Sequence, residues 1–255
     1  NTLMGVHAGG GLVEGTDNVA IGWSALKTEN AHGGNVAIGK EALKTLDAGA
    51  EGYNVAVGLR AGYLMTTGTH NTLVGGLAGD SMTTAVHNVA IGYNAMTAVT
   101  EGNTNIAIGR DALATNTVGD RNVAIGHEAL MTMNPTGDSD NYNVAVGYNA
   151  GKAVTTGAQN TILGGLAGDA LTTGSENIMI GYNAGTATTI ANNNVAIGIG
   201  ALATNVAADR NVAIGTQALT AMTLATTADH FNVAVGNKAG FAVTSGVNNT
   251  LLGAS

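Results

Sequence analysis

A five-residue motif recurs about every 17 residues from one end of the chain to the other. Each copy opens with Asn and ends with Gly, as in Asn18-Val19-Ala20-Ile21-Gly22. A short period sustained over 255 residues is typical of solenoids, and it overrides the one or two globular domains that the length alone suggests. The opening Asn residues lie at 1, 18, 35, 54, 71, 88, 105, 122, 143, 160, 177, 194, 211, 232 and 249.

The pattern within one repeat predicts an all-β parallel β-solenoid (a β-roll) with about 17 residues and two short strands per coil. Positions 2 and 4 are mostly Val and Ile, so positions 1–5 are expected to form a strand that buries these two side chains. Apolar residues at positions 9 and 12 favour a second, looser strand over positions 8–13. The small residues at positions 1, 3, 5 and 8 are expected to face a neighbouring chain. The invariant positions then form structural ladders along the stack, for example Asn18, Asn35 and Asn54; Gly22, Gly39 and Gly58; and Ala25, Ala42 and Ala61.

A second period of 89 residues groups the repeats into blocks, at 54–142 and 143–231, inside one continuous repeat domain (1–255). Each block ends in a longer repeat, with four extra residues within 131–142 and 220–231. These insertions are either binding loops on one face or length drift from block duplication. Some repeats carry Thr at position 2 and Leu or Ile at position 3, which indicates either a chain–chain contact or a rearranged core.

Composition excludes several classes of protein. Charged residues make up only 10% of the chain, and the formal net charge is −8. An acidic chain without a basic stripe argues against nucleic acid and against anionic membrane surfaces as partners. No run of 18 apolar residues and no secretion signal is visible, so we expect no membrane insertion. The chain has no Cys, which excludes disulfides.

The string Asn-Val-Ala-Ile-Gly, with Ala three residues further on, resembles the head repeats of trimeric autotransporter adhesins and repeats of bacteriophage tail fibres. The resemblance covers essentially the whole chain. It implies a left-handed parallel β-roll with three chains side by side. The adhesin head repeats are typically shorter than 17 residues.

The sequence gives little indication of catalytic, metal-binding or ligand-binding residues. His70 and His87 both occupy position 17 of adjacent repeats, but two imidazoles are too few for a metal site, so they are interpreted as a solvated pair. No Ser, His and acid recur as a cluster, so we expect no catalytic residues, no metal and no cofactor. Aromatic residues at position 6 could stack on sugar rings, although scattered surface aromatics are also common: Trp23, Tyr93, Tyr148 and Tyr182.

The sequence therefore predicts a non-enzymatic structural shaft of an extracellular fibre or filament, on a cell surface or virion, as in a phage tail fibre or bacterial adhesin. Its expected partner is itself, as a trimer or a joined filament. A glycan- or surface-binding module that uses loops or turn aromatics is the alternative. An ice-binding solenoid and a polysaccharide depolymerase are less favoured, because the paired Thr residues skip several repeats and no carboxylate cluster lies on one face.

Overall fold

The computed structural model describes residues 1–49, 51–137, 139–223 and 227–254. Its fold is an all-β parallel β-solenoid of about 14 turns, with about 17 residues per coil. This confirms the predicted fold class; within the described residues there is no helix of the length and hydropathy needed to cross a membrane. The chain forms two compact units, Asn1–Asn122 with Asn134–Ser139 and Val123–Met133 with Asp140–Ser255. Coils are numbered below by their opening Asn, so coil 2 starts at Asn18.

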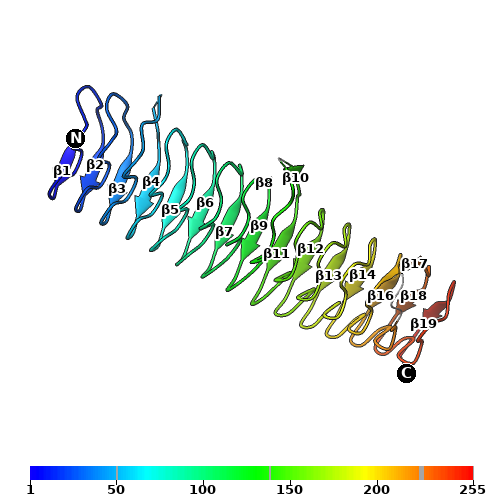
Figure 1. Ribbon diagram of the computed structural model, residues 1–255. Helices are drawn as coiled ribbons and strands as arrows, with labels where there is room; N and C mark the ends of the chain where they lie inside the picture. The colour runs from blue at the N-terminus through cyan, green and yellow to red at the C-terminus, as the bar shows by residue number, and fades with distance from the viewer. Residues whose placement is uncertain (50, 138, 224–226, 255) are drawn as a thin grey trace. The chain divides into compact units, whose positions relative to one another are not determined.

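In the first compact unit, each coil contributes one three-residue strand to a parallel sheet (Figure 1). Each residue pairs with its equivalent in the next coil, for example Ala20 with Ala37, and the register is kept across the 19-residue coil 3, where Ala37 pairs with Ala56. The strands are β1 (Thr2–Met4), β2 (Val19–Ile21), β3 (Val36–Ile38), β4 (Val55–Val57), β5 (Thr72–Val74), β6 (Val89–Ile91) and β7 (Ile106–Ile108).

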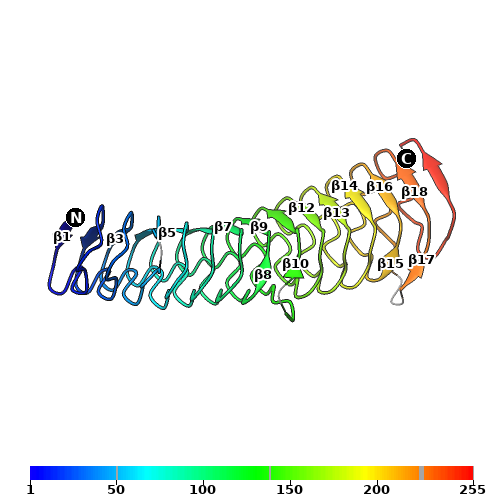
Figure 2. The ribbon, with the colours of Figure 1, turned by 90° about the horizontal axis from the view of Figure 1, so that it is seen from above.

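The second compact unit repeats this arrangement. Its sheet strands are β9 (Val123–Ile125), β11 (Val144–Val146), β12 (Thr161–Leu163), β13 (Ile178–Ile180), β14 (Val195–Ile197), β16 (Val212–Ile214), β18 (Val233–Val235) and β19 (Thr250–Leu252). Four further strands have only two residues each: β8 (Gly119–Asp120), β10 (Ser139–Asp140), β15 (Ala208–Asp209) and β17 (Ala228–Asp229). β15 pairs with β17, on the opposite side of the coils from β14, β16 and β18 (Figure 2).

The second strand expected at positions 8–13 does not form. Residues at positions 7 and 9 adopt left-handed backbone conformations, as at Glu41 (φ 59°) and Leu43 (φ 46°), and such residues cannot continue a strand. The segment still joins coil to coil, because position 9 donates its N–H to position 8 of the next coil, as from Leu26 to the Ala42 carbonyl at 2.9 Å. Each full coil thus begins with one short strand followed by a run of hydrogen-bonded turns, and four coils add a two-residue strand near their end.

The interior is lined by the small face of the strand and not by its Val and Ile. Position 3 is buried, with Ala20 and Ala37 fully inaccessible, whereas Val19 and Ile21 on either side of Ala20 are half-buried. The expectation that Val and Ile fill the core, with the small residues facing a neighbouring chain, is therefore wrong. The interior of a 17-residue coil is narrow, so Ala at positions 3 and 8 leaves room for the large side chains at positions 9 and 12, such as Leu43 and Leu46, which are both fully buried.

The Thr-Leu repeats reflect packing inside the core. Leu73 and Ile162, at position 3, are fully buried, and position 9 of their own coils is Gly. A Cβ at Gly79 would lie 3.0 Å from a Leu73 methyl, and one at Gly62 in the preceding coil would lie 2.9 Å from the other. In these coils the large side chain is at position 3 instead of position 9, and the two neighbouring glycines leave room for it.

The long repeats at 131–142 and 220–231 lie partly outside the described residues, which omit 138 and 224–226. The described part of the second insertion adds β17 beside β15, and the sheet register continues from Ala213 to Ala234. The extra residues therefore leave the solenoid frame intact.

Candidate interaction surface

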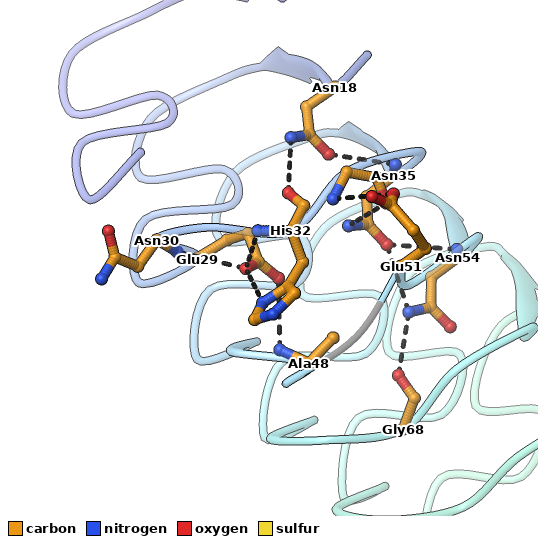
Figure 3. A network of polar contacts seen from close by, with 10 residues as sticks. Asn18, Glu29, Asn30, His32, Asn35, Ala48, Glu51, Asn54 and Gly68 are labelled. Atoms are coloured by element: carbon orange, nitrogen blue, oxygen red, sulfur yellow. Dashed lines mark hydrogen bonds and ion pairs between the residues drawn. The ribbon is translucent and has the colours of Figure 1, made fainter. Parts of the chain in front are cut away.

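The invariant Asn residues form a hydrogen-bonded ladder inside the coils (Figure 3). The Oδ1 atom of Asn18 accepts the backbone N–H of Asn35 at 3.0 Å, and Oδ1 of Asn35 accepts both the N–H and the Nδ2 of Asn54 at 3.2 Å. The Nδ2 of Asn18 donates to the His32 carbonyl at 2.9 Å, and that of Asn54 donates to the Gly68 carbonyl at 2.9 Å. These amides are buried and satisfied, so they hold the frame together and offer nothing to a ligand.

The Gly and Ala ladders close the first turn. Gly22 has φ 131°, and a Cβ there would lie 2.6 Å from the carbonyl oxygen of Gly39, so no other residue fits without moving the next coil. The N–H of Ala25 donates to the Gly22 carbonyl at 3.3 Å. Ala25, Ala42 and Ala61 are fully buried, which leaves no room for a larger side chain.

The outward face of the sheet is apolar. In all fifteen repeats, the residues at positions 2 and 4 are Val, Ile, Leu, Met or Thr, with no charged residue among them. In the first compact unit these side chains are half-buried or exposed along every strand, and Ile91 and Ile106 are 37% and 36% exposed. The second compact unit presents the same face, with Ile178 at 38% and Val235 at 37%. We call this surface the outward sheet face.

The four aromatic residues at position 6 follow the strands in sequence and are well exposed: Trp23 46%, Tyr93 53%, Tyr148 58% and Tyr182 54%. Their surroundings differ. Lys40 and Lys44 approach the Trp23 ring, and His127 stacks on Tyr148 with ring centroids 5.5 Å apart. Tyr93 and Tyr182 cover glycines, because a Cβ at Gly76 or Gly165 would lie 3.5 or 3.6 Å from the tyrosine ring. The aromatic residues therefore occupy separate local sites.

A buried carboxylate in coil 2 was not identified from the sequence. Glu29 is fully buried; its Oε1 accepts the N–H groups of Asn30 (3.1 Å) and His32 (3.2 Å), and its Oε2 accepts that of Ala48 (3.3 Å). Asp47 lies near enough to Glu29 and His32 for the three to surround a cation. Figure 3 shows the Glu29 oxygens directed at these donors, so the carboxylate ties coil 2 to the longer coil 3. The available signal was a charged residue at the usually apolar position 12.

Three ring side chains form a column at the last position of coils 3 to 5, which is position 19 in coil 3 and position 17 in coils 4 and 5. The rings of Tyr53 and His70 are 5.3 Å apart, and those of His70 and His87 are 4.9 Å apart. All three residues are exposed and have φ between 48° and 60°. The two histidine rings lie in contact but are tilted by 41°, and the third member of the column is a tyrosine ring and not a third imidazole or a carboxylate.

Charged residues gather on the first turns of coils 3 to 5. Lys44 Nζ lies 2.7 Å from Glu41 Oε1, and this hydrogen bond lowers the pKa of Glu41 and raises that of Lys44. Arg60 Nε lies 3.4 Å from Asp80 Oδ1. Burial raises the pKa of Asp80 in spite of the neighbouring guanidinium. Lys44 and Arg60 are thus held in position by acidic groups, by Glu41 on the same turn and by Asp80 on the first turn of the next coil.

The chain matches no protein-family model, no curated protein and no solved structure. Its function therefore has to be argued from the outward sheet face and from the first turns.

Proposed function

We propose that this chain is a structural segment of an extracellular fibre, in which three copies pack side by side through their outward sheet faces. The observation that carries the proposal is the outward sheet face itself. Each compact unit carries its own exposed apolar patch of this kind, and such a patch marks an interaction surface in soluble proteins. Because the narrow interior already holds its own Ala and Leu residues, the Val and Ile side chains can be fully buried only by another molecule.

A second copy of the chain is the partner that fits this surface best. The Val and Ile columns repeat at the spacing of neighbouring strands, which is about 4.8 Å. Two copies aligned along their axes meet coil against coil, so each pair of coils makes the same contact. A partner without this period would match the columns only locally. Closed cyclic assembly of identical chains is also the common way to cover such a face.

Extension is the role that the internal hydrogen bonds support. Each coil bonds only to its neighbours, through the sheet, the Asn ladder and the turns, as is usual in solenoids. The position-13 hydroxyls are also used in this way: Thr66 donates to the Thr83 carbonyl and Thr83 to the Thr100 carbonyl, each at 3.1 Å. Hydroxyls that bond the next coil are poorly placed to order ice, which favours a shaft over an ice-binding surface.

The mass of the purified protein in solution tests the proposal. Light scattering coupled to gel filtration is expected to give about three times the chain mass of 25.2 kDa. Placing a charge in the middle of the outward sheet face, as in Val89→Glu, should convert the assembly to monomers, because a carboxylate cannot be buried without a partner. The matched control is Thr84→Glu, which adds the same charge at an exposed turn position. A folded wild-type monomer would refute the proposal, as would equal dissociation of both variants.

A further inference from the structure

Cations and aromatic rings are concentrated on the first turns of coils 2 to 4. Lys40 Nζ lies 5.3 Å from the centre of the Trp23 ring, and Lys44 Nζ lies 5.8 Å from it. Lys44 is also 5.1 Å from the Tyr63 ring, and the Arg60 guanidinium carbon is 4.1 Å from that ring. We call these five side chains the coil 2–4 patch: Trp23, Lys40, Lys44, Arg60 and Tyr63.

The solenoid frame does not require the patch residues of coils 2 and 3. The block at 143–231 and the coil that follows it repeat the same frame positions, with the same Asn, Gly and Ala ladders. The residues on the first turns nevertheless differ. The equivalents of Trp23, Lys40 and Lys44 there are Ile199, Thr216 and Thr220. Since those coils fold without an aromatic ring or a cation at these positions, the patch residues of coils 2 and 3 are free to serve binding.

The patch is locally cationic in an acidic protein. Lys27 belongs to the same region, because the N–H of Thr28 donates to the Lys44 carbonyl at 3.2 Å. Lys27, Lys40, Lys44 and Arg60 are thus four of the nine basic residues of a chain whose net charge is −8. Two carboxylates, Glu41 and Asp80, pair with Lys44 and Arg60. Within the described residues Lys40 makes no ion pair, so its ammonium group remains available to an incoming anion.

The arrangement selects a ligand that has both an apolar face and a negative charge. Trp23 is 46% exposed, so its indole ring offers a flat surface on which a small ring can stack. Lys40 beside it offers a charged hydrogen-bond donor for a carboxylate or sulfate group. We propose that the coil 2–4 patch binds an acidic saccharide, meaning a pyranose that carries a carboxylate or a sulfate. This goes beyond the structural role proposed above and does not depend on the number of chains.

The fluorescence of Trp23 provides a direct test, because it is the only tryptophan in the chain. The full chain is titrated with three polymers that share one sugar backbone: dextran, carboxymethyl-dextran and dextran sulfate. A saturable change of Trp23 emission with at least one charged polymer, but not with dextran, is expected, and its strength should fall with salt. The two charged polymers distinguish a carboxylate from a sulfate. No change with either, or an equal change with dextran, would overturn the proposal.

A pair of charge variants locates the site. Lys40→Gln should weaken binding about threefold, which is the scale of one exposed charge contact. Lys238→Gln removes the same charge from the first turn of coil 14 and should leave binding unchanged. Both side chains lie on the surface, and circular dichroism checks that the variants fold. Equal weakening by both would mean that overall charge, and not the patch, attracts the polymer. Equally tight binding of poly-glutamate would refute the saccharide assignment.

Discussion

The exchange of bulk between positions 3 and 9 predicts a strong energetic coupling inside coil 5. Leu73 is fully buried there, between Gly79 of its own coil and Gly62 of coil 4. Leu73→Ala leaves a cavity next to both glycines, and such a truncation costs about 3 kcal/mol of unfolding free energy. Gly79→Leu alone places a Cβ 2.9 Å from the Met82 sulfur and 3.0 Å from Leu73, at φ 58°. Overpacking and the left-handed backbone together make that change cost about 3 kcal/mol as well.

The double variant Leu73→Ala/Gly79→Leu should cost far less than the sum. It gives coil 5 the Ala, Leu, Met combination that coil 8 carries naturally at Ala124, Leu130 and Met133. The left-handed Leu is tolerated there, with φ 47° at Leu130. The remaining cost is the backbone strain and the void beside Gly62, which together come to about 3 kcal/mol, so the coupling energy is about 3 kcal/mol.

Urea unfolding followed by circular dichroism measures the four members of this cycle at one protein concentration, since assembly affects apparent stability. Leu73→Ala combined with Gly168→Leu is the matched control: it pairs the same two substitution types in different blocks, and the costs should add. Additive costs within about 0.5 kcal/mol for the coil 5 pair would refute the packing explanation.

Three further predictions concern the frame and its charges. Gly22→Ala should destabilise the protein by several kcal/mol, because residue 22 has φ 131° and its Cβ would lie 2.6 Å from the Gly39 carbonyl oxygen. A shift in the urea midpoint no larger than that of an exposed surface substitution would contradict this. Asn35→Ala should cost about 2–4 kcal/mol, because the buried N–H of Asn54 loses its acceptor and Nδ2 of Asn54 keeps only the Gly68 carbonyl. Hydrogen exchange at the Asn54 N–H that is no faster than in wild type would argue against it. The raised pKa of Asp80 means that its contribution to stability is full below the ordinary Asp pKa and is lost as pH rises through the raised value. Thermal unfolding between pH 3 and pH 7 should therefore show wild type losing stability relative to Asp80→Asn as pH rises, and a constant difference would exclude this effect.

The period and the strand position could be predicted from the sequence, but the side of the strand that faces inward could not. Alternation places positions 2 and 4 on one face without saying whether that face is the interior. Val19 and Ile21 are larger and more apolar than Ala20, so burying them is the usual choice. In this fold Ala20 faces inward instead, because the interior of the coil is too narrow for Val19 and Ile21. The invariance of Asn, Gly and Ala at positions 1, 5 and 8 carries the correct signal, since residues vary least where neighbouring coils leave no room.

The left-handed turns were beyond sequence reasoning for a different reason. Leu26 and Leu43 have φ of 48° and 46°, a conformation that large side chains rarely adopt. Their isolated preference favours an extended or helical backbone, which made a second strand the natural expectation. Burial of the two Leu side chains and the hydrogen bonds to the next coil offset the backbone strain. These compensating contacts exist only in the stacked coils, so the sequence of one repeat does not reveal them.

The 89-residue period has a physical origin in the interior. In each block, one coil carries Leu or Ile at position 3 next to two position-9 glycines, one in its own coil and one in the coil before it, and such a coil cannot be moved without creating a void or a clash. The coil before each long coil has a polar residue at position 12, namely Glu29, Asn116 and Asn205. Asn116 bonds the N–H and carbonyl of Gly119, and Asn205 bonds those of Ala208, in the segment that leads into the longer coil. Packing thus fixes the order of coils within a block. The first-turn positions are free of this constraint, because their residues differ even between coils with the same interior residues, as in coils 7 and 12. Differences such as Trp23 against Ile199 are therefore the places where selection for binding can act without disturbing the stack.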